Sequence, residues 1–590
     1  MTQAAKLPAK VSAVAYRRWR VGEVLGRNIF FIFVVLILLW LILFPIAQMI
    51  VNSFRTGHPA VPGPFTLQNY IVGYTNPLTY QMILNTFIFA GTSTMISVTV
   101  AILFAWLTER TDMPLRNLAW SLLLVPLAMP GLLFSISWVL LLAPKIGLVN
   151  VGLRALLGGL GFELQADPIN IYSMGGMIFL DGLRGITTVF LLVAGAFRMM
   201  DPALEEAART SGAKTYKTFF KITLPILLPA ILAAFLYSFV SSMESFEAPL
   251  VVGMPAKIYV YSTMIYFSTR VVLSYGLAGA FGVSYFLLAL ILVYIYQRVV
   301  IYRSERFATI TGKGYRPHVI SLGKWRYFAL GLFFVYFLFA VVLPLAVLVW
   351  LSLLTNYRGE GGNLFQNFSL NHYRNLFAEE GIVKATWNTV VITVTTATAT
   401  VLLSFFISWI IVRMKVRGRF LLDGFTFLSH AVPGILVALA FIFLYLQPPF
   451  KYLGIYGTVW IISLALITQY VAFTSRATNA AITQVHQELE EAGRVLGASR
   501  TTVLLKITLP LIFPAIAAAW IWVAAHAVRA FSVPLMLAGQ ENWTLSVMLW
   551  HYWAEDQVLP QAAALGVLLM LAITLLTFAG RRVIVQTFSQ

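Results

Sequence analysis

The side chains best suited to chemistry are charged residues that stand inside long apolar stretches of the sequence. Asp181 and Arg184 lie three positions apart in one stretch, and Glu244 and Glu247 lie near the end of the next. A charge inside a membrane span is costly, so each of these residues is a candidate for lining a solute path. Asp181 and Arg184 could instead neutralise each other across one helical turn.

Different polar groups stand at the equivalent positions later in the chain. At an offset of 285 residues, Arg529 aligns with Glu244, and Gln469 aligns with Arg184. If the two parts pack symmetrically, a glutamate faces an arginine. Both residues lie about 28 Å of helix beyond the loop that precedes their span, which places them near the outer gate. Glu244 and Arg529 are then either a pair that lines the pore and contacts substrate or a buried salt bridge.

A loop between two apolar stretches carries residues that could receive another protein. Asp201 can cap a short helix that begins at Pro202, and Gly212 permits the turn that ends it. One face of this helix would carry small side chains, so that a partner surface could approach closely. This face consists of Leu204, Ala207, Ala208 and Ser211 in the first copy and of Leu489, Ala492, Gly493 and Leu496 in the second.

The elements that position these residues are membrane-spanning helices. Of 590 residues, 59% are hydrophobic and 11% are charged, whereas an average soluble domain carries about 25% charged residues. Continuous apolar runs of about 20 residues, without strand-like alternation, predict an all-α membrane protein. We expect Pro130-Gly131 and Pro433-Gly434 to kink the third and ninth spans. The twelve expected spans lie near 28–50, 82–107, 118–142, 171–199, 226–247, 273–300, 328–353, 387–412, 421–446, 457–480, 511–535 and 561–580.

The distribution of positive charge predicts how these spans are oriented. The formal net charge of +19 is concentrated in the loops on one side of the predicted spans. By the positive-inside rule, both termini and the central linker lie in the cytoplasm. The surplus charge therefore sets topology and does not indicate a nucleic-acid partner. The absence of cysteine excludes structural disulfides and thiolate metal sites, and we expect no metal site.

The spans fall into two homologous halves. Phe65 to Tyr70 return as Phe368 to Tyr373 at an offset of 303, and Lys221 to Pro225 return unchanged at an offset of 285. The 18 extra residues of the first half fit the Gly-rich outer stretch 147–167. Two six-helix halves of the same orientation pack about a pseudo-twofold along the membrane normal. The expected segments are a cytoplasmic N-terminal segment 1–27, a first half 28–301, a cytoplasmic linker 302–326, a second half 327–580 and a cytoplasmic tail 581–590.

The repeated loop resembles the EAA loop of the permeases of ATP-binding-cassette (ABC) importers. Both copies carry a triplet that begins Glu-Ala, a glycine four residues after the triplet and a later Leu-Pro pair. The one departure within the triplet is a glycine in place of the second alanine in the second copy, a small-for-small change. The matching residues are Glu206, Ala207, Ala208, Gly212, Leu224 and Pro225, and Glu491, Ala492, Gly493, Gly497, Leu509 and Pro510.

This resemblance implies a fused, two-half permease of a type I importer in the bacterial inner membrane. The loop would form a coupling helix on a separate ATPase, with Glu206 and Glu491 paired to basic or amide groups. The sequence has no Gly-rich phosphate-binding loop ending in Gly-Lys-Ser/Thr, so we expect no enzyme and no cofactor on this chain. Two ATPase subunits, as a homodimer, would bind ATP and Mg. A periplasmic binding protein would deliver the substrate.

The expected substrate is ferric iron, because the stretch from Glu244 to Tyr266 looks most like the ferric-iron group of fused permeases. The alternatives for the same machinery are 2-aminoethylphosphonate, thiamine and polyamines. A twelve-span secondary transporter, a different class, would share the topology but has no reason to repeat the loop. A membrane enzyme would need a cluster of acid, base or metal-binding residues, which the sequence lacks.

Overall fold

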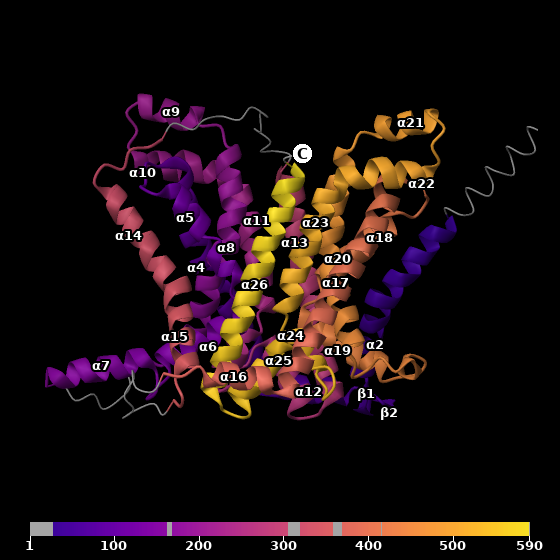
Figure 1. The fold of residues 1–590 in the computed structure, drawn as a ribbon, viewed down its shortest axis with the longest axis horizontal. Coiled ribbons are helices and arrows are strands. Elements are labelled where there is room, and N and C mark those ends of the chain that lie inside the picture. Colours follow the sequence, from indigo (N-terminus) through magenta and orange to yellow (C-terminus); the bar gives the residue numbers. More distant parts are fainter. Residues whose placement is uncertain (1–27, 162–167, 305–318, 358–367, 415, 589–590) are drawn as a thin grey trace, which may run out of the picture.

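The computed structural model describes residues 28–161, 168–304, 319–357, 368–414 and 416–588 (Figure 1). Within these ranges, ten helices are long and apolar enough to cross a membrane, and two bent pairs bring the number to twelve if each is one span. The predicted all-α architecture is confirmed. The expected N-terminal segment 1–27 and residues 305–318 of the expected linker lie outside the described residues.

Five of the ten long spans belong to each half. In the first half, three spans are single helices: α4 (Pro77–Arg110), α8 (Met174–Met199) and α13 (Tyr275–Ser304). The span Asn28–Ser53 ends in α2 (Phe44–Ser53), and the span Thr215–Glu244 contains α10 (Thr215–Thr218) and α11 (Leu224–Glu244). In the second half, the single helices are α17 (Glu380–Arg413), α20 (Val459–Gln484) and α26 (Leu559–Phe588). The span Trp325–Leu353 contains α14 (Trp325–Phe337) and α15 (Leu343–Leu353), and the span Thr501–Val528 contains α23 (Leu509–Val528).

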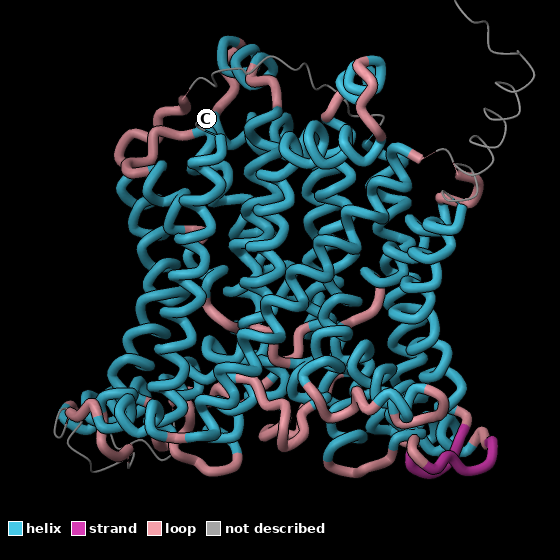
Figure 2. The backbone as a smooth tube through the Cα atoms, turned by 45° about the vertical axis from the view of Figure 1, so that its right-hand side comes forward, coloured by secondary structure: helices cyan, strands magenta, loops and turns pink. Residues whose placement is uncertain are grey.

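The third span of each half is broken where the sequence predicts a kink. Residues Arg116–Ala128, which include α5 (Arg116–Leu122), meet α6 (Gly131–Leu142) at 96°. In the second half, α18 (Phe420–His430) meets α19 (Gly434–Tyr445) at 105°. Pro130 directly precedes α6 and Pro433 directly precedes α19, with extended ψ angles of 139° and 145°. The backbone therefore turns through about a right angle at each break. Figure 2 shows loop segments inside the helical bundle, between its two ends.

The two halves interlock through these broken spans. The helix α2 of the first half packs against α19 of the second, and α15 of the second half packs against α6 of the first. Every residue of α19 is buried, as are eleven of the twelve residues of α6. A helix that is apolar on all sides belongs in a core. The broken spans therefore form the centre of the molecule.

Each fifth span begins with a π turn in front of a proline. The turn spans Phe219–Thr223 in the first half and Leu504–Thr508 in the second, and Pro225 and Pro510 follow it directly in α11 and α23. A proline ring has no N–H and clashes with the carbonyl four residues earlier. The wider turn relieves this clash, because its bonds run from residue i to i+5.

Short elements cover the two ends of the bundle. One end carries the C-terminal end of α26 together with α9 (Ala203–Thr210), α21 (Gln487–Val495) and α22 (Arg500–Val503) (Figure 1); we call it the α9/α21 end. The predicted extra stretch 147–167 lies at the opposite end as α7 (Leu148–Gly159), and residues 162–167 are outside the described ranges. Also near that end are β1 (Arg55–His58) and β2 (Val61–Phe65), which pair antiparallel, with α3 (Gln68–Thr75), α12 (Tyr261–Arg270), α16 (Asn371–Ala378), α24 (Ser532–Leu537) and α25 (Leu545–Ala554).

Candidate functional site

The helices α9 and α21 stand at the α9/α21 end with caps that the sequence partly predicts. Asp201 Oδ1 accepts a hydrogen bond of 2.9 Å from the Ala203 N–H, as expected of a capping residue, but α9 begins at Ala203, one residue later than expected, and Pro202 is its N-cap residue. Gly212 and Gly497 adopt φ angles of +83° and +87°. Only glycine takes this conformation without a steric cost, and it lets the Ala213 N–H reach the carbonyl of Ala208 at 3.0 Å, a Schellman cap.

The predicted face of these helices is largely exposed and carries leucine side chains. Leu204 is 57% exposed in α9, and Leu489 is 49% exposed in α21. Just beyond α21, Leu496 is 88% exposed. Exposed apolar residues that gather on one face mark a surface for another protein. Glu206, Ala207, Ser211, Glu491 and Ala492 are also exposed.

Gly493 departs from the predicted face, because it is buried. A Cβ atom at this position would lie 2.7 Å from Ile507 Cδ1 and 3.2 Å from Val503 Cγ2. The glycine therefore allows α21 to pack closely on the π turn that follows it. Its small size serves packing within this chain and not the approach of a partner. Ala208 is half-buried at the equivalent position in α9.

A buried ion pair anchors α9, and sequence reasoning missed it. Glu205, the neighbour of the predicted Glu206, is buried and lies 3.5 Å from Arg110 Nε at the end of α4. The Thr223 hydroxyl donates to the same carboxylate at 2.5 Å from the π turn. Arg110 also donates to the carbonyls of Phe197 and Met200 at 3.0 and 2.9 Å, at the end of α8. Three spans thus meet at one arginine–glutamate pair.

The second half repeats this anchor. Arg413 Nε donates to Glu490 Oε1 at 2.8 Å, and the Thr508 hydroxyl donates to the same oxygen at 3.3 Å. Arg413 also donates to the carbonyls of Ile482 and Val485 at 3.0 and 2.5 Å. The same offsets of 303 and 285 residues relate Arg413 to Arg110, and Glu490 to Glu205. That pairing in the repeat could have identified both anchors.

The two Leu-Pro pairs connect these anchors to the fifth spans. Leu224 and Pro225 begin α11, and Leu509 and Pro510 begin α23, in each case directly after the π turn that carries the anchoring threonine. The helix α9 contacts one π turn and α21 contacts the other. A displacement of either short helix is therefore passed to the start of a membrane span.

Of the two readings of Asp181 and Arg184, the structure does not show the direct ion pair across one helical turn. Arg184 Nη1 lies 3.8 Å from Glu247 Oε2, beyond the end of α11, and the Ser242 hydroxyl donates to Asp181 at 2.6 Å. Asp181 and Arg184 share one helix, but each finds its partner on the fifth span or just beyond it. The two charges therefore tie α8 to that segment.

The residues Arg184 and Gln469 cover the two breaks in the third spans. A Cβ atom at Gly131 would lie 2.3 Å from Arg184 Nη1, and one at Gly434 would lie 2.9 Å from Gln469 Nε2. Glycine at the start of α6 and α19 therefore lets a long polar side chain lie directly on the backbone. The predicted alignment of Arg184 with Gln469 corresponds to two equivalent positions in space.

Glu244 and Arg529 do not face each other, which corrects the second expectation. Arg529 donates to the carbonyl of Leu127, in the other half, and to His526 Nε2 at 2.6 Å. Glu244 instead lines a small cavity between α11 and α13. The two side chains lie apart because Arg529 reaches across the interface between the halves, whereas Glu244 lies among residues of its own half.

The chain is similar to known permeases over most of its length. It is 26% identical over 556 residues to the ferric transport system permease protein FbpB of Actinobacillus pleuropneumoniae, covering 92% of this chain and 76% of that protein. It is 26% identical over 521 residues to the putative ferric transport system permease protein FbpB 1 of Haemophilus influenzae, covering 85% and 77%. The spermidine/putrescine transport system permease protein PotC of Haemophilus influenzae is 28% identical over 160 residues, which are 27% of this chain and 60% of PotC.

Solved transporters share smaller parts of the chain. A bacterial ABC transporter that imports the acidic polysaccharide alginate aligns with a TM-score of 0.36 and 19% identity, covering 44% of this chain and 96% of its own. The MetNI methionine ABC transporter aligns with a TM-score of 0.29 and 17% identity, covering 35% and 95%.

A family model matches both halves of the chain. It describes the inner membrane component of binding-protein-dependent transport systems and matches residues 97–306 and 400–590. Each match includes one of the anchored short helices, α9 or α21. The chain therefore belongs to the family of binding-protein-dependent transport system inner membrane components, as a permease with two fused halves.

Proposed function

We propose that α9 and α21 are coupling helices that dock on two separate ATPase subunits of an ABC importer. The observation that carries this proposal is the repeated anchor, which holds an exposed short helix on a buried arginine–glutamate pair in both halves. Glu206 and Glu491 are exposed beside that apolar surface. They can pair with basic or amide groups of the ATPases without disturbing the anchors.

The α9/α21 end faces the cytoplasm in this proposal. The positive-inside rule assigns the basic loops to that side, and the C-terminal end of α26 lies there too. Both termini and the linker between the halves are then cytoplasmic, and the chain lies in the bacterial inner membrane. Residues 28–301 and 327–580 form the two permease halves.

The transport cycle follows from the way the anchors connect the elements. A periplasmic binding protein delivers the substrate to the end opposite α9 and α21. Binding of Mg-ATP by the ATPase homodimer closes that dimer and moves the coupling helices together. The anchors and π turns pass this movement to α4, α8 and α11 and to their counterparts, which opens the path outward. Hydrolysis on the ATPases, and not on this chain, resets the cycle.

The proposed substrate is ferric iron. Two relatives that cover at least 85% of this chain are ferric transport permeases by name. Polyamine import is the second candidate, because part of the chain is similar to PotC. Import of 2-aminoethylphosphonate or thiamine would use the same machinery. Family membership and the repeated coupling helices favour all of these over a twelve-span secondary transporter.

Co-purification with the ATPase tests the docking proposal. Changing Gly212 and Gly497 together to leucine places a side chain at two positive φ angles, which L residues adopt at a cost of about 1–2 kcal/mol each. We expect the wild type to retain its ATPase through purification and the double variant to lose it. Gly195→Leu is a matched control, because a Cβ there meets no atom within 4 Å. Retention of the ATPase by the double variant would contradict the proposal.

A further inference from the structure

Two equivalent stripes of side chains on the fifth spans differ in charge. Tyr237, Ser241 and Glu244 follow one another along one face of α11 at i, i+4 and i+7. An offset of 285 residues relates them to Trp522, His526 and Arg529, on α23 or at its end. One stripe is acidic and rich in hydroxyl groups, and the other is basic.

The basic stripe is filled by its own side chains. The Trp522 and His526 rings stack with centroids 3.9 Å apart, and Arg529 donates to His526 at 2.6 Å. A second guanidinium nitrogen, Nη1, donates to the Leu127 carbonyl of the other half. The side chains of this stripe therefore pack against one another and against the other half.

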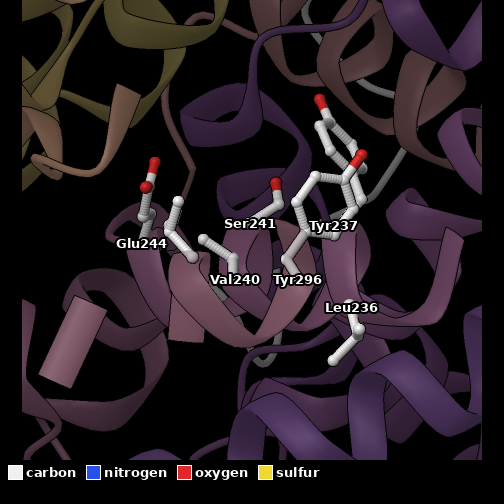
Figure 3. A pocket seen from close by; sticks show the side chains of 7 residues that line it. Leu236, Tyr237, Val240, Ser241, Glu244 and Tyr296 are labelled. Atoms are coloured by element: carbon white, nitrogen blue, oxygen red, sulfur yellow. The ribbon is translucent and has the colours of Figure 1, made fainter. Parts of the chain in front are cut away.

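The acidic stripe leaves space instead. Its three residues line a cavity of ≈ 70 Å³ together with Leu236 and Val240 of α11 and Val293 and Tyr296 of α13 (Figure 3). A water molecule needs about 10–15 Å³ of such space, so several fit. In Figure 3 the Glu244 carboxylate and the hydroxyl groups of Ser241, Tyr237 and Tyr296 lie on the same side of the ribbon. Among the residues that the structure describes, no basic side chain lines the cavity.

The Glu244 carboxylate has no partner of its own. Among the described residues, it forms no salt bridge and accepts no hydrogen bond. A carboxylate at such a position inside a membrane protein faces a water-filled cavity or a solute path. One carboxylate and three hydroxyl oxygens are hard donors, and hard donors suit cations.

We propose that this cavity, which we call the Glu244 site, binds a cation during its passage through the permease. This inference rests on the proposed function and narrows the substrate to a positively charged solute. Any such solute would be bound through its positive charge, by oxygen donors and by the faces of two tyrosine rings. The cation is either a hard metal ion or the ammonium group of a polyamine. The second half offers no equivalent site, because Arg529 stands at the position of Glu244.

Binding of Tb³⁺ to the full-length permease in phosphatidylcholine nanodiscs tests the site directly. Tb³⁺ is a hard trivalent probe whose emission neighbouring tyrosines sensitise, and this assay needs no ATPase or binding protein. We expect saturable emission from one ion per chain, weakened roughly tenfold or more by Glu244→Gln, since ligand charge sets the affinity of such sites. Glu380→Gln is the matched control, because this exposed glutamate lies at the start of another span, and its variant should bind like the wild type.

Tyr296→Phe gives an independent measurement, because it keeps the ring and removes one oxygen donor. We expect it to weaken Tb³⁺ binding less than Glu244→Gln does. Competition then identifies the source of the cation: displacement by Ga³⁺ indicates a metal solute, and displacement by spermidine indicates an ammonium solute. The inference is overturned if wild-type emission does not saturate, if Glu244→Gln and Tyr296→Phe both bind like the wild type, or if neither competitor displaces Tb³⁺.

Uptake into proteoliposomes that hold the complete transporter separates this inference from the proposed function. Failure of the wild type to import both ferric ion and spermidine would count against the proposed function, whatever the result with Tb³⁺. Wild-type uptake that Glu244→Gln leaves unchanged would overturn only the Glu244 site. We expect uptake by the wild type and by Glu380→Gln, and at least a tenfold lower initial rate for Glu244→Gln.

Discussion

At the scale of single residues, burial separates two neighbouring glutamates in each of the loops that contain α9 and α21. Glu205 is 5% exposed and pairs with Arg110, which is 2% exposed, whereas Glu206 is exposed. A buried ion pair is sensitive to the loss of one partner, because the other charge is then left uncompensated. Glu205 therefore holds α9 in place, while Glu206 remains available to another protein.

Replacement of Glu205 by glutamine is expected to destabilise the permease. The variant removes the negative charge beside Arg110, and breaking a buried pair costs about 3–5 kcal/mol. The melting temperature of the purified chain should fall. Glu490→Gln should lower it less, because the Arg413 and Glu490 side chains are 8% and 15% exposed against 2% and 6% for the first pair.

Glu206→Gln is the matched control for this measurement. It should leave the melting temperature unchanged and weaken ATPase co-purification. Equal melting temperatures for Glu205→Gln and Glu206→Gln would show that the buried pair does not anchor α9.

At the scale of elements, the breaks in the third spans depend on glycine. Arg184 lies against Gly131 and reaches Glu247 from there, so the start of α6 and the segment after α11 share one side chain. Gln469 repeats the contact on Gly434 without a charge. The broken spans are thus held by the fourth spans of their own halves.

Gly131→Ala is expected to slow transport. The added Cβ would lie 2.3 Å from Arg184 Nη1, so the guanidinium must move and its ion pair with Glu247 is weakened. We expect a several-fold lower uptake rate in proteoliposomes. Gly434→Ala should have a smaller effect, because its closest contact is 2.9 Å. Gly195→Ala meets no atom within 4 Å and should transport like the wild type; equal rates for all three variants would contradict this role.

The chain that follows α4 pairs with the end of the linker. Asp112 accepts hydrogen bonds from the Leu322 N–H at 2.8 Å and from the Ser321 hydroxyl at 3.1 Å. The Leu322 bond, followed by that of Ser321, holds the pKa of Asp112 below its ordinary value of 3.8. The ionised carboxylate therefore stabilises the docked linker at neutral pH, and this contribution is lost as the pH falls through the lowered pKa.

The difference between the wild type and Asp112→Asn should therefore depend on pH. We expect the variant to have a slightly lower melting temperature at pH 7 and the same melting temperature as the wild type well below pH 3.8, the ordinary pKa. A difference that persists at the lowest pH would indicate that the charge of Asp112 is not involved.

At the scale of the whole molecule, two arginines join the halves away from the α9/α21 end. Arg529 reaches the Leu127 carbonyl. Arg270, at the end of α12, donates to the carbonyls of Leu535, Met536 and Ala538 at 3.1, 2.8 and 2.8 Å. It borders a cavity of ≈ 260 Å³ that both halves line. These bonds favour the arrangement in which the halves meet at that end.

Arg270→Ala is expected to shift the complex towards the outward-open state. The variant loses the Nη2 donor that three carbonyls of the other half share. Its two hydrogens can form hydrogen bonds worth about 1.5–3 kcal/mol each for a charged donor. ATP hydrolysis by the reconstituted transporter without binding protein should rise several-fold. Lys451→Ala, a change at an exposed residue of the same end, should leave hydrolysis at the wild-type rate. An unchanged rate for Arg270→Ala would show that these bonds do not hold the outer end closed.

The sequence by itself determined the spans, the two halves and the repeated loops that contain α9 and α21. Apolar runs, caps and positive-φ glycines act within a few residues, so Gly212 and the kinks at Pro130 and Pro433 could be predicted from local chemistry. The repeat added equivalent positions, and Arg184 and Gln469 do occupy equivalent places beside Gly131 and Gly434.

Only the tertiary structure decided which charges meet. Arg184 pairs with Glu247 and not with Asp181, Glu205 is buried against Arg110, and Glu244 lies apart from Arg529. Each choice depends on how spans far apart in the sequence rotate and pack against one another. Sequence spacing fixes the face of a helix on which a side chain lies, but it does not fix the neighbour that this face meets.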